Sequence, residues 1–560
     1  MRGNRARRFL IAAMTLLASQ GASAQSQDPS QVGSWTQVRS WPPATHTHLL
    51  PTGVVMFFGE FESGDSSYLW DPTTDVLTPL PRAGYNIFCA GHSFLGDGRL
   101  MVAGGHADLH VGLAQASLFD PFTNSWTRLP DMNERRWYPS STTLPSGDAL
   151  VVSGEIDRMG VTDNLPQIYE VATGKWRDLT TAVRSFPFYP REFVAPNGKV
   201  FVAGPQLISW YLDTSGTGKW TRVADRALVL LRDYGPAVLY GKGKILYMGG
   251  HDPPSETAEA IDLEAPSPAW RFVSPMSVPR RQHNATLLPD GKILVTGGSS
   301  GPGFNNSDVP ALSSEVWDPE TGRWTTWASL PVFRGYHSTA LLLPDGRVLS
   351  AGGTGAAYYS MELFSPPYLF RGPRPVITSA PDSIDLDEPF PVETPDGGAV
   401  AKVSLIRLGS VTHAFDENQR FVPLEFTWSA GVLTVRAPPS SNLAPPGHYM
   451  LFLVDAAGVP SAAKIVRLSN HGFVPPTTPP PPSGAPQQPP ITQPGQASPP
   501  PDPLPSSIGS TTDGANHTAG SSGCTSAQGL NVLAGLGLVL WLSVRVRRRC
   551  GQRAGAGARW

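Results

Sequence analysis

The sequence feature that most limits the possible folds is a repeat with a period of about 48 residues. Each repeat has a turn glycine, then an apolar strand that usually ends in a single glycine or a glycine pair. The turn glycines, spaced 45 to 55 residues apart, are Gly53, Gly98, Gly147, Gly198, Gly243, Gly291 and Gly346. Seven copies of one strand-rich unit predict seven similar small sheets.

Several repeats add an aspartate–proline turn followed by a tryptophan, as in residues 120–126 and 318–324. This pattern is typical of the kelch repeat, in which each unit is one four-stranded blade of a β-propeller. We therefore predict an all-β fold with a seven-bladed kelch β-propeller over residues 25–372. Glycine and proline make up about 20% of the chain, twice the usual share. That composition excludes an ordinary helical or doubly wound α/β protein.

After residue 372 the repeat stops and a different strand pattern begins. Short apolar segments at 401–407, 431–436, 449–454 and 463–468 lie between turns rich in proline, glycine and aspartate. About 95 residues of this kind are typical of an immunoglobulin-like β-sandwich. We predict such a domain over residues 373–470.

Both ends of the chain carry sorting features. Arginines, an apolar run and Ala22-Ser23-Ala24 predict a signal peptide at 1–24. Residues 471–523 have the proline-rich composition of an extended stalk. Residues 524–549 hold a cysteine, an apolar stretch and an arginine cluster, which resembles myxobacterial surface-sorting signals or a plain membrane anchor. We expect export to the cell envelope or surface, with possible release by processing near Cys524.

Charge and cysteine content exclude one class of partner and one means of stabilising the fold. A formal net charge of −2 provides no basic field for phosphates, so no nucleic-acid partner is expected. The three cysteines are Cys89, Cys524 and Cys550, and only the first lies in the predicted domains. No disulfide framework is therefore available to hold the fold.

Nine residues before each turn glycine lies the same position of each repeat. We call these the ring positions, because sevenfold quasi-symmetry should place them around one axis. In chain order they are Ala44, Cys89, Tyr138, Tyr189, Tyr234, Gln282 and His337. Taken singly, each is most simply explained by packing. Together with the neighbouring Tyr336, however, imidazole and phenolate side chains on one ring favour a Cu(II) site.

At this point the chain resembles the copper radical oxidases, the family of galactose oxidase and glyoxal oxidase. The resemblance covers residues 32–468 and rests on four segments. They are Asn86-Ile-Phe-Cys-Ala-Gly91, Arg136-Trp-Tyr-Pro-Ser-Ser141, Arg334-Gly-Tyr-His-Ser338 and the stretch from Ser404 to His413 followed by Gln419-Arg420.

The resemblance implies a role for five residues. Cys89 and Tyr138 would form a thioether-linked radical cofactor, and Tyr336 would be the axial base. Tyr138, Tyr336, His337 and His413 would bind one copper ion per chain. His413 would reach the propeller from a loop of the sandwich.

The implied function is that of an exported copper-dependent oxidase. It would act on small aldehydes or primary alcohols with O2, release H2O2 and need no organic cofactor beyond its own side chains. We expect a monomer. The alternative is a non-catalytic, surface-displayed kelch propeller that binds glycan or protein, since a fold does not fix a function.

Two departures from galactose oxidase are visible. That enzyme stacks an indole over the thioether shortly after a glycine pair, whereas Ser153-Gly154 is followed here by Glu155-Ile156. The match is closer to glyoxal oxidases, which makes galactose a doubtful substrate. Tyr189, Arg191 and Tyr234 either orient substrate or serve packing and hydrogen bonding. His106 and His110 are most simply exposed or capped histidines, and the alternative is that both lie at the cavity rim.

Overall fold

The computed structural model describes residues 28–61 and 64–470. Within these ranges the chain is almost entirely β, and its helical segments are α1 (Pro29–Val32), η1 (Gly355–Ala357) and η2 (Pro367–Phe370). The predicted signal peptide, stalk and anchor lie outside the described residues. Among the residues described, no helix is long and apolar enough to cross a membrane.

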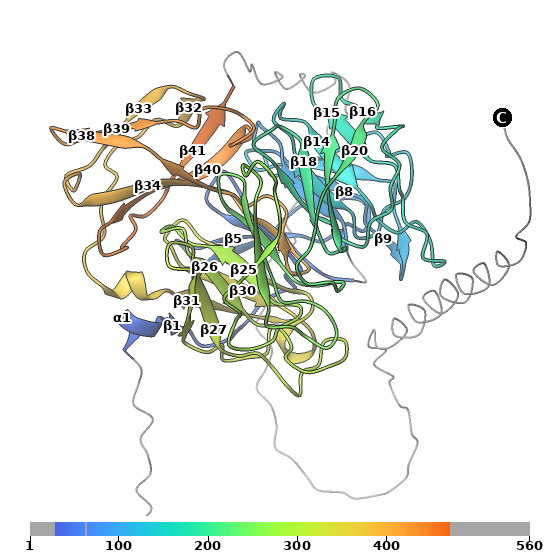
Figure 1. Ribbon diagram of the computed structural model, residues 1–560, viewed down its shortest axis with the longest axis horizontal. Coiled ribbons are helices and arrows are strands. Elements are labelled where there is room, and N and C mark those ends of the chain that lie inside the picture. Colours follow the sequence, from blue (N-terminus) through green and yellow to red (C-terminus); the bar gives the residue numbers. More distant parts are fainter. Residues whose placement is uncertain (1–27, 62–63, 471–560) are drawn as a thin grey trace, which may run out of the picture. The chain divides into compact units, whose positions relative to one another are not determined.

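Seven antiparallel sheets follow one another along the chain, as predicted from the repeat (Figure 1). Blade 1 contains β3 (His46–Leu49), β4 (Val55–Phe58), β5 (Tyr68–Asp71) and β6 (Val76–Pro79). Blade 2 contains β7 (Gly91–Phe94), β8 (Leu100–Ala103), β11 (Ala116–Asp120) and β12 (Ser125–Arg128), with the hairpin β9 (His106–Asp108) and β10 (Val111–Gly112) between its second and third strands. Blade 3 contains β13 (Ser140–Thr143), β14 (Ala149–Val152), β15 (Gln167–Glu170) and β16 (Lys175–Asp178).

The other blades repeat this order. Blade 4 contains β17 (Arg191–Val194), β18 (Val200–Gly204), β19 (Ile208–Asp213) and β20 (Lys219–Asp225). Blade 5 contains β21 (Ala237–Gly241), β22 (Lys244–Met248), β23 (Ala258–Asp262) and β24 (Arg271–Val273). Blade 6 contains β25 (Asn284–Leu287), β26 (Ile293–Thr296), β27 (Ser314–Asp318) and β28 (Arg323–Trp327).

Blade 7 joins the two ends of the propeller. Its strands β29 (Ser338–Leu342), β30 (Val348–Gly352) and β31 (Ser360–Ser365) are completed by β1 (Ser34–Trp35) and β2 (Arg39–Ser40), which both pair with β31. The first strands of the chain thus finish its last blade and leave that edge paired.

The apolar strand of each repeat is the second strand of its blade and is buried. Core clusters run between neighbouring blades, for example from Leu150 and Val152 of blade 3 to Val200 and Val202 of blade 4. The predicted tryptophans lie on the outer strands and also join blades. Trp176 Nε1, for instance, donates a hydrogen bond of 2.8 Å to Pro130 O after blade 2.

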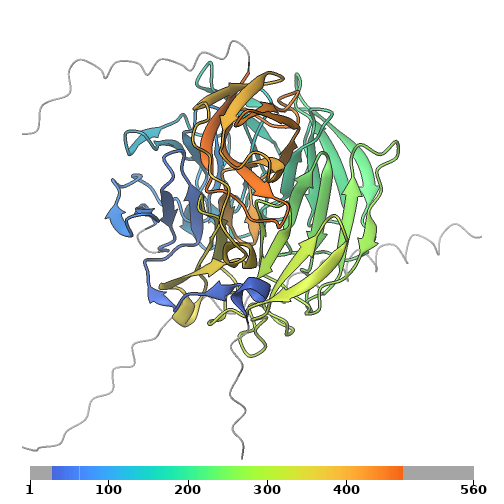
Figure 2. The same cartoon turned by 90° about the vertical axis from the view of Figure 1, so that its left-hand side faces the viewer.

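The sandwich that follows has two sheets. One contains β32 (Ser383–Asp385), β34 (Val400–Arg407), β37 (Phe421–Leu424), β40 (Gly447–Asp455) and β41 (Lys464–Ser469). The other contains β33 (Pro389–Glu393), β38 (Phe426–Ser429) and β39 (Val432–Arg436). In Figure 2 its orange strands lie in front of the propeller, with blue blades on one side and green blades on the other.

A hairpin of the sandwich enters the propeller. We call β35 (Ser410–Thr412) and β36 (Phe415–Asp416) the finger. β35 pairs with β3 in register His46 with Thr412, and it also packs against β7 and β29. The sandwich body itself contacts the far ends of the inner strands, where Arg407 bonds Phe94 O and Arg420 bonds Val194 O. The finger therefore runs along the propeller axis toward the starts of the inner strands.

Candidate active site

Six of the seven ring positions share an uncommon backbone conformation. Cys89, Tyr138, Tyr189, Tyr234, Gln282 and His337 have φ between 44° and 67°, while Ala44 does not. Left-handed backbone costs a residue with a side chain about 1–2 kcal/mol. The kink lies just before the inner strand of each blade, so the cost is met by the packing of the whole propeller.

Backbone hydrogen bonds link these positions from blade to blade. The N–H of Tyr138 donates to Cys89 O at 3.0 Å, and the N–H of Tyr189 donates to Tyr138 O at 2.9 Å. Gln282 N–H likewise donates to Tyr234 O at 2.9 Å. Main-chain hydrogen bonds thus join Cys89 to Tyr138 and Tyr189, and Tyr234 to Gln282, so positions that the repeat aligns are neighbours in space.

The finger brings His413 to this ring. His413 also has a left-handed backbone, with φ of 45°. His413 Nδ1 lies 2.6 Å from Thr412 Oγ1, and its Nε2 lies 2.9 Å from Tyr138 Oη. The imidazole stacks on the ring of Tyr189 with centroids 4.8 Å apart. One nitrogen is thus fixed by the finger while the other faces the phenol.

The connection from blade 6 to blade 7 supplies the remaining pair. Tyr336 Oη and Tyr138 Oη are direct hydrogen-bond partners. The rings of Tyr336 and His337 lie 3.8 Å apart, and those of His337 and His413 lie 4.8 Å apart. His337 Nε2 is buried and has no hydrogen-bond partner among the described residues. Four residues from three distant parts of the chain therefore converge.

Burial sets the protonation of this group. Burial chiefly raises the pKa of Tyr138 far above its ordinary value, with Cys89 and Tyr336 adding to the effect. Burial lowers the pKa of His337 to about 3 and that of His413 well below its usual range. Both imidazoles are therefore neutral at pH 7, the form in which histidine binds metals.

The donor set fits copper. Two neutral imidazoles and two phenols suit Cu(II), and the unpartnered His337 Nε2 is a buried donor atom that a metal would satisfy. The described residues contain no group of three or more His, Cys, Asp or Glu side chains that could hold a metal ion, and at this site two of the four candidate donors are tyrosines.

Cys89 lies directly beside the phenols. It is fully buried and forms one small cluster with Phe88, Trp137, Tyr138 and Tyr189. The structure thus brings together all five residues singled out from the sequence: Cys89, Tyr138, Tyr336, His337 and His413.

An indole covers Tyr138 after all, from a different place in the chain. Glu155 occupies the position after the glycine and pairs with His110. The stacked ring is that of Trp137, whose centroid lies 3.8 Å from that of Tyr138 with planes inclined by 10°. Its Nε1 donates to Nδ1 of the buried His106 at 3.0 Å. The absence of an indole after Gly154 is therefore confirmed, and Trp137, from the motif at 136–141, covers Tyr138 instead.

For three residues the sequence left two roles open, substrate orientation or packing, and the structure places them differently. Tyr189 is buried and donates to Ala90 O at 3.1 Å. Arg191 is buried and binds main-chain oxygens of Tyr189 and Gly235. Both are structural supports. Tyr234 is half-buried, and its ring lies 5.6 Å edge-on from that of Tyr336, so it borders the site.

Two site residues escaped the sequence reasoning. Phe304, 40% exposed, packs edge-on against Tyr336 at 4.8 Å. The neighbouring Asn305 accepts a hydrogen bond from the N–H of Tyr336 at 2.8 Å and donates to Thr354. Both lie in the loop between β26 and β27. The unusual length of that connection was the available signal.

Buried arginines support the ring positions, and these too were missed. Each lies two or three residues before a ring position, bonds a main-chain oxygen at the end of the second strand, and pairs with a carboxylate of its own blade. The pairs are Arg136–Asp163, Arg232–Glu259, Arg280–Glu315 and Arg334–Glu362. The recurring arginine was the signal for them.

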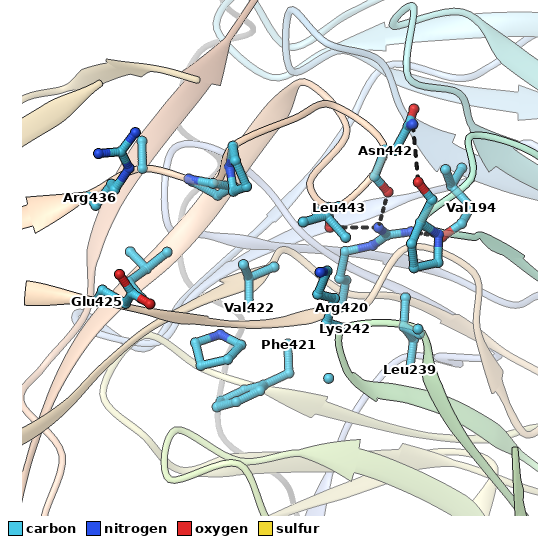
Figure 3. Close-up of a pocket in the computed structure, with 18 residues that line it drawn as sticks. Val194, Leu239, Lys242, Arg420, Phe421, Val422, Glu425, Arg436, Asn442 and Leu443 are labelled. Atoms are coloured by element: carbon cyan, nitrogen blue, oxygen red, sulfur yellow. Dashed lines mark hydrogen bonds between the residues drawn. The ribbon is translucent and has the colours of Figure 1, made fainter. Parts of the chain in front are cut away.

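A cavity of about 290 Å³ lies elsewhere, between blades 4 and 5 and the sandwich (Figure 3). Figure 3 shows its largely apolar wall, with Phe421, Val422 and Leu239 beside Arg420. None of the five converging residues lines it. We therefore do not assign the chemistry to this cavity.

Comparison with known proteins agrees with this geometry. Residues 374–468 match the family model described as galactose oxidase-like, Early set domain. Residues 244–368 match glyoxal oxidase N-terminus, and residues 95–133 match the Kelch motif. The chain is 32% identical over 443 residues to galactose oxidase of Gibberella zeae, covering 71% of this chain and 64% of that protein.

The predicted resemblance to the galactose oxidase and glyoxal oxidase family is confirmed. Aldehyde oxidase GLOX of Vitis pseudoreticulata is 28% identical over 462 residues, which cover 72% of this chain and 85% of that protein. A solved structure titled as a novel fungal alcohol oxidase of the AA5 family, in complex with copper, superposes with a TM-score of 0.71 at 28% identity. That match covers 78% of this chain and all of the other. The predicted all-β fold of propeller and sandwich is thereby confirmed.

Proposed function

We propose that the chain is an exported copper radical oxidase that oxidises small primary alcohols or aldehydes with O2 and releases H2O2. The observation that carries this proposal is the convergence of two phenols and two neutral imidazoles beside the buried Cys89. The oxidase relatives support it. The signal-peptide pattern at residues 1–24 supports export.

Copper would be held by the phenol oxygens of Tyr138 and Tyr336 and the imidazoles of His337 and His413. When bound, it would lower the pKa of the phenols and exchange electrons with substrate and O2. Thr412 and Tyr189 hold the imidazole of His413 in place, so little of the ligand set has to reorganise on metal binding.

The side chains of the site then divide the work on an alcohol. Tyr336 Oη takes the proton of the substrate hydroxyl. Cys89 and Tyr138, once joined through a thioether, carry a radical that removes a hydrogen atom from the carbinol carbon. In the full turnover the alcohol loses two hydrogens and becomes an aldehyde, while O2 gains both and becomes H2O2.

The direct test is an assay of peroxide release by the copper-loaded full chain with a panel of primary alcohols and aldehydes. The proposal expects peroxide and oxidised product in equal amounts. Absence of peroxide with every member of the panel, from protein shown to hold copper, would contradict it.

Replacing one imidazole tests the metal site. We expect the wild-type chain to bind one Cu(II), and His337→Ala to weaken binding by more than about 100-fold, because even indirect supports of a metal cost 10–100-fold. Equilibrium dialysis against a copper chelator measures this. His448→Ala, on a mostly buried histidine of the sandwich, is the control and should bind copper as the wild type does. Equal copper affinity in both variants would contradict the ligand assignment.

The stacked indole tests the radical. Trp137→Phe removes part of the ring that covers Tyr138 and the hydrogen bond to His106. We expect the radical of the oxidised protein to decay several-fold faster than in wild type. Electron paramagnetic resonance measures this decay. Trp126→Phe, on the outer strand of blade 2, is the control and should leave the decay unchanged. Equal lifetimes for Trp137→Phe and wild type would argue against a protective role.

A further inference from the structure

A chain of buried histidines connects Cys89 to the finger. The backbone N–H of Cys89 donates to His46 Nε2 at 3.0 Å. His46 Nδ1 lies 3.1 Å from His92 Nε2, and His92 Nδ1 lies 2.6 Å from Ser410 Oγ on β35. All four residues are completely buried. The chain links blade 2, blade 1 and the finger.

The direction of each hydrogen bond in this chain follows from its first link. A backbone N–H can only donate, so His46 Nε2 must be the acceptor. An imidazole nitrogen that accepts a hydrogen bond carries no proton, so His46 is neutral with its proton on Nδ1, and the same reasoning then applies to His92. His46 Nδ1 therefore donates to His92 Nε2, and His92 Nδ1 donates to Ser410 Oγ. The contact of His92 with Glu417 at 3.2 Å is accordingly not an ion pair.

The end of this hydrogen-bonded histidine series that lies at the finger is fixed by further hydrogen bonds. Glu417, which follows β36, accepts hydrogen bonds from the N–H groups of His92 at 2.7 Å and Ser141 at 3.1 Å. Ser410 N–H donates to Asp416 across the finger at 2.9 Å. The segment that brings His413 to Tyr138 thus also anchors the support of Cys89.

The N–H of Cys89 has a different partner from the N–H groups of three other ring positions that share its left-handed backbone. At Tyr138, Tyr189 and Gln282 the N–H donates to the carbonyl of the preceding ring position. The position before Cys89 is Ala44, which lacks the left-handed backbone, and the N–H of Cys89 goes to His46 instead. The imidazole of His46 therefore takes the place that a ring-position carbonyl has at those three residues.

We propose that His46, oriented by His92 and Ser410, is a positioning residue that holds Cys89 in the left-handed conformation required to join Tyr138. This deepens the proposed function, on which it rests. In the joining step the sulfur of Cys89 bonds to a ring carbon of Tyr138. The thiol and that carbon each lose one hydrogen, and the two electrons and two protons reduce one O2 to H2O2.

Two amide variants of His46 show whether the position of its acceptor atom matters, rather than only the loss of the imidazole ring. The oxygen of Gln in His46→Gln extends about as far as Nε2 and can accept from Cys89, whereas that of Asn in His46→Asn extends only as far as Nδ1. His48→Asn is the matched control, because His48 is equally buried on the same strand and bonds Ser410 at 2.9 Å but has no hydrogen bond to Cys89. Thermal unfolding of each full-length variant establishes that it is folded.

The first measurement is made without copper, by hydrogen–deuterium exchange of peptides containing Cys89. We expect His46→Asn to speed exchange at this segment about tenfold, the loss of roughly one buried hydrogen bond, and His46→Gln and His48→Asn to change it little. Equal exchange in His46→Asn and His46→Gln would overturn the positioning role, whatever the chain catalyses.

The second measurement adds Cu(II) and O2 and follows thioether formation by mass spectrometry. His46→Asn should form the bond about tenfold more slowly than wild type, and His46→Gln should recover most of the rate. Ser410→Ala, once thermal unfolding has shown that it is folded, should slow it by a smaller factor. Wild-type rates in His46→Asn and Ser410→Ala would overturn the inference. If the wild type forms no thioether, the proposed function fails, and the exchange data alone decide the role of His46.

Discussion

A Tyr336→Phe variant is expected to lose about 10²–10⁴-fold of the turnover rate with a primary alcohol, the usual worth of a positioned proton acceptor. The hydroxyl of Tyr336 contacts that of Tyr138, and nothing else at this point takes the proton of the substrate in our account. Phenylalanine keeps the ring that packs against His337 and Phe304. The measurement is kcat from peroxide release.

Two controls make that result specific. Mass spectrometry should find the Cys89–Tyr138 bond intact in Tyr336→Phe, because neither of its residues is changed. Tyr359→Phe, at an exposed tyrosine of the same blade, should leave kcat unchanged. A Tyr336→Phe enzyme with kcat within threefold of wild type would remove Tyr336 from the mechanism.

A Glu315→Gln variant is expected to lose about 3–5 kcal/mol in the free energy of unfolding, because it leaves the buried Arg280 without its counter-charge. Both side chains are within 1% of full burial, and Glu315 also accepts from the N–H and hydroxyl of Ser277. Urea unfolding measures the change.

The matched control uses an exposed glutamate of the same blade, in the turn between β27 and β28. Glu320 is 68% exposed and pairs with Lys402 of the sandwich. Glu320→Gln should cost no more than about 1 kcal/mol, as exposed pairs generally do. Similar losses in the two variants would show that the buried arginine pairs do not hold the blades.

The repeat predicted most of the fold because its signal is local. A turn glycine and an apolar second strand are properties of adjacent residues, and β4, β8, β14, β18, β22, β26 and β30 all lie where the pattern places them. The completion of blade 7 by β1 and β2 was not predicted. Those strands are two residues long, and their partner lies more than 300 residues away.

The site residues that could be predicted from the sequence are those that the repeat or a sequence motif marks. Counting back from the turn glycines collected Cys89, Tyr138 and His337 without any contact information. Phe304 and Asn305 belong to an irregular loop that no periodicity describes, so only the fold reveals that they border Tyr336. The absence of an indole after Gly154 was read correctly, but its replacement by Trp137 depends on a ring orientation that sequence does not give.

The central claim is tested most directly by peptide mass spectrometry of the full chain after exposure to Cu(II) and O2, followed by reduction. The account predicts that the peptides containing Cys89 and Tyr138 remain joined, with a mass lower by two hydrogens than their sum. A Cys89 that is still alkylated as a thiol after this treatment would contradict the radical oxidase and favour a propeller that only binds.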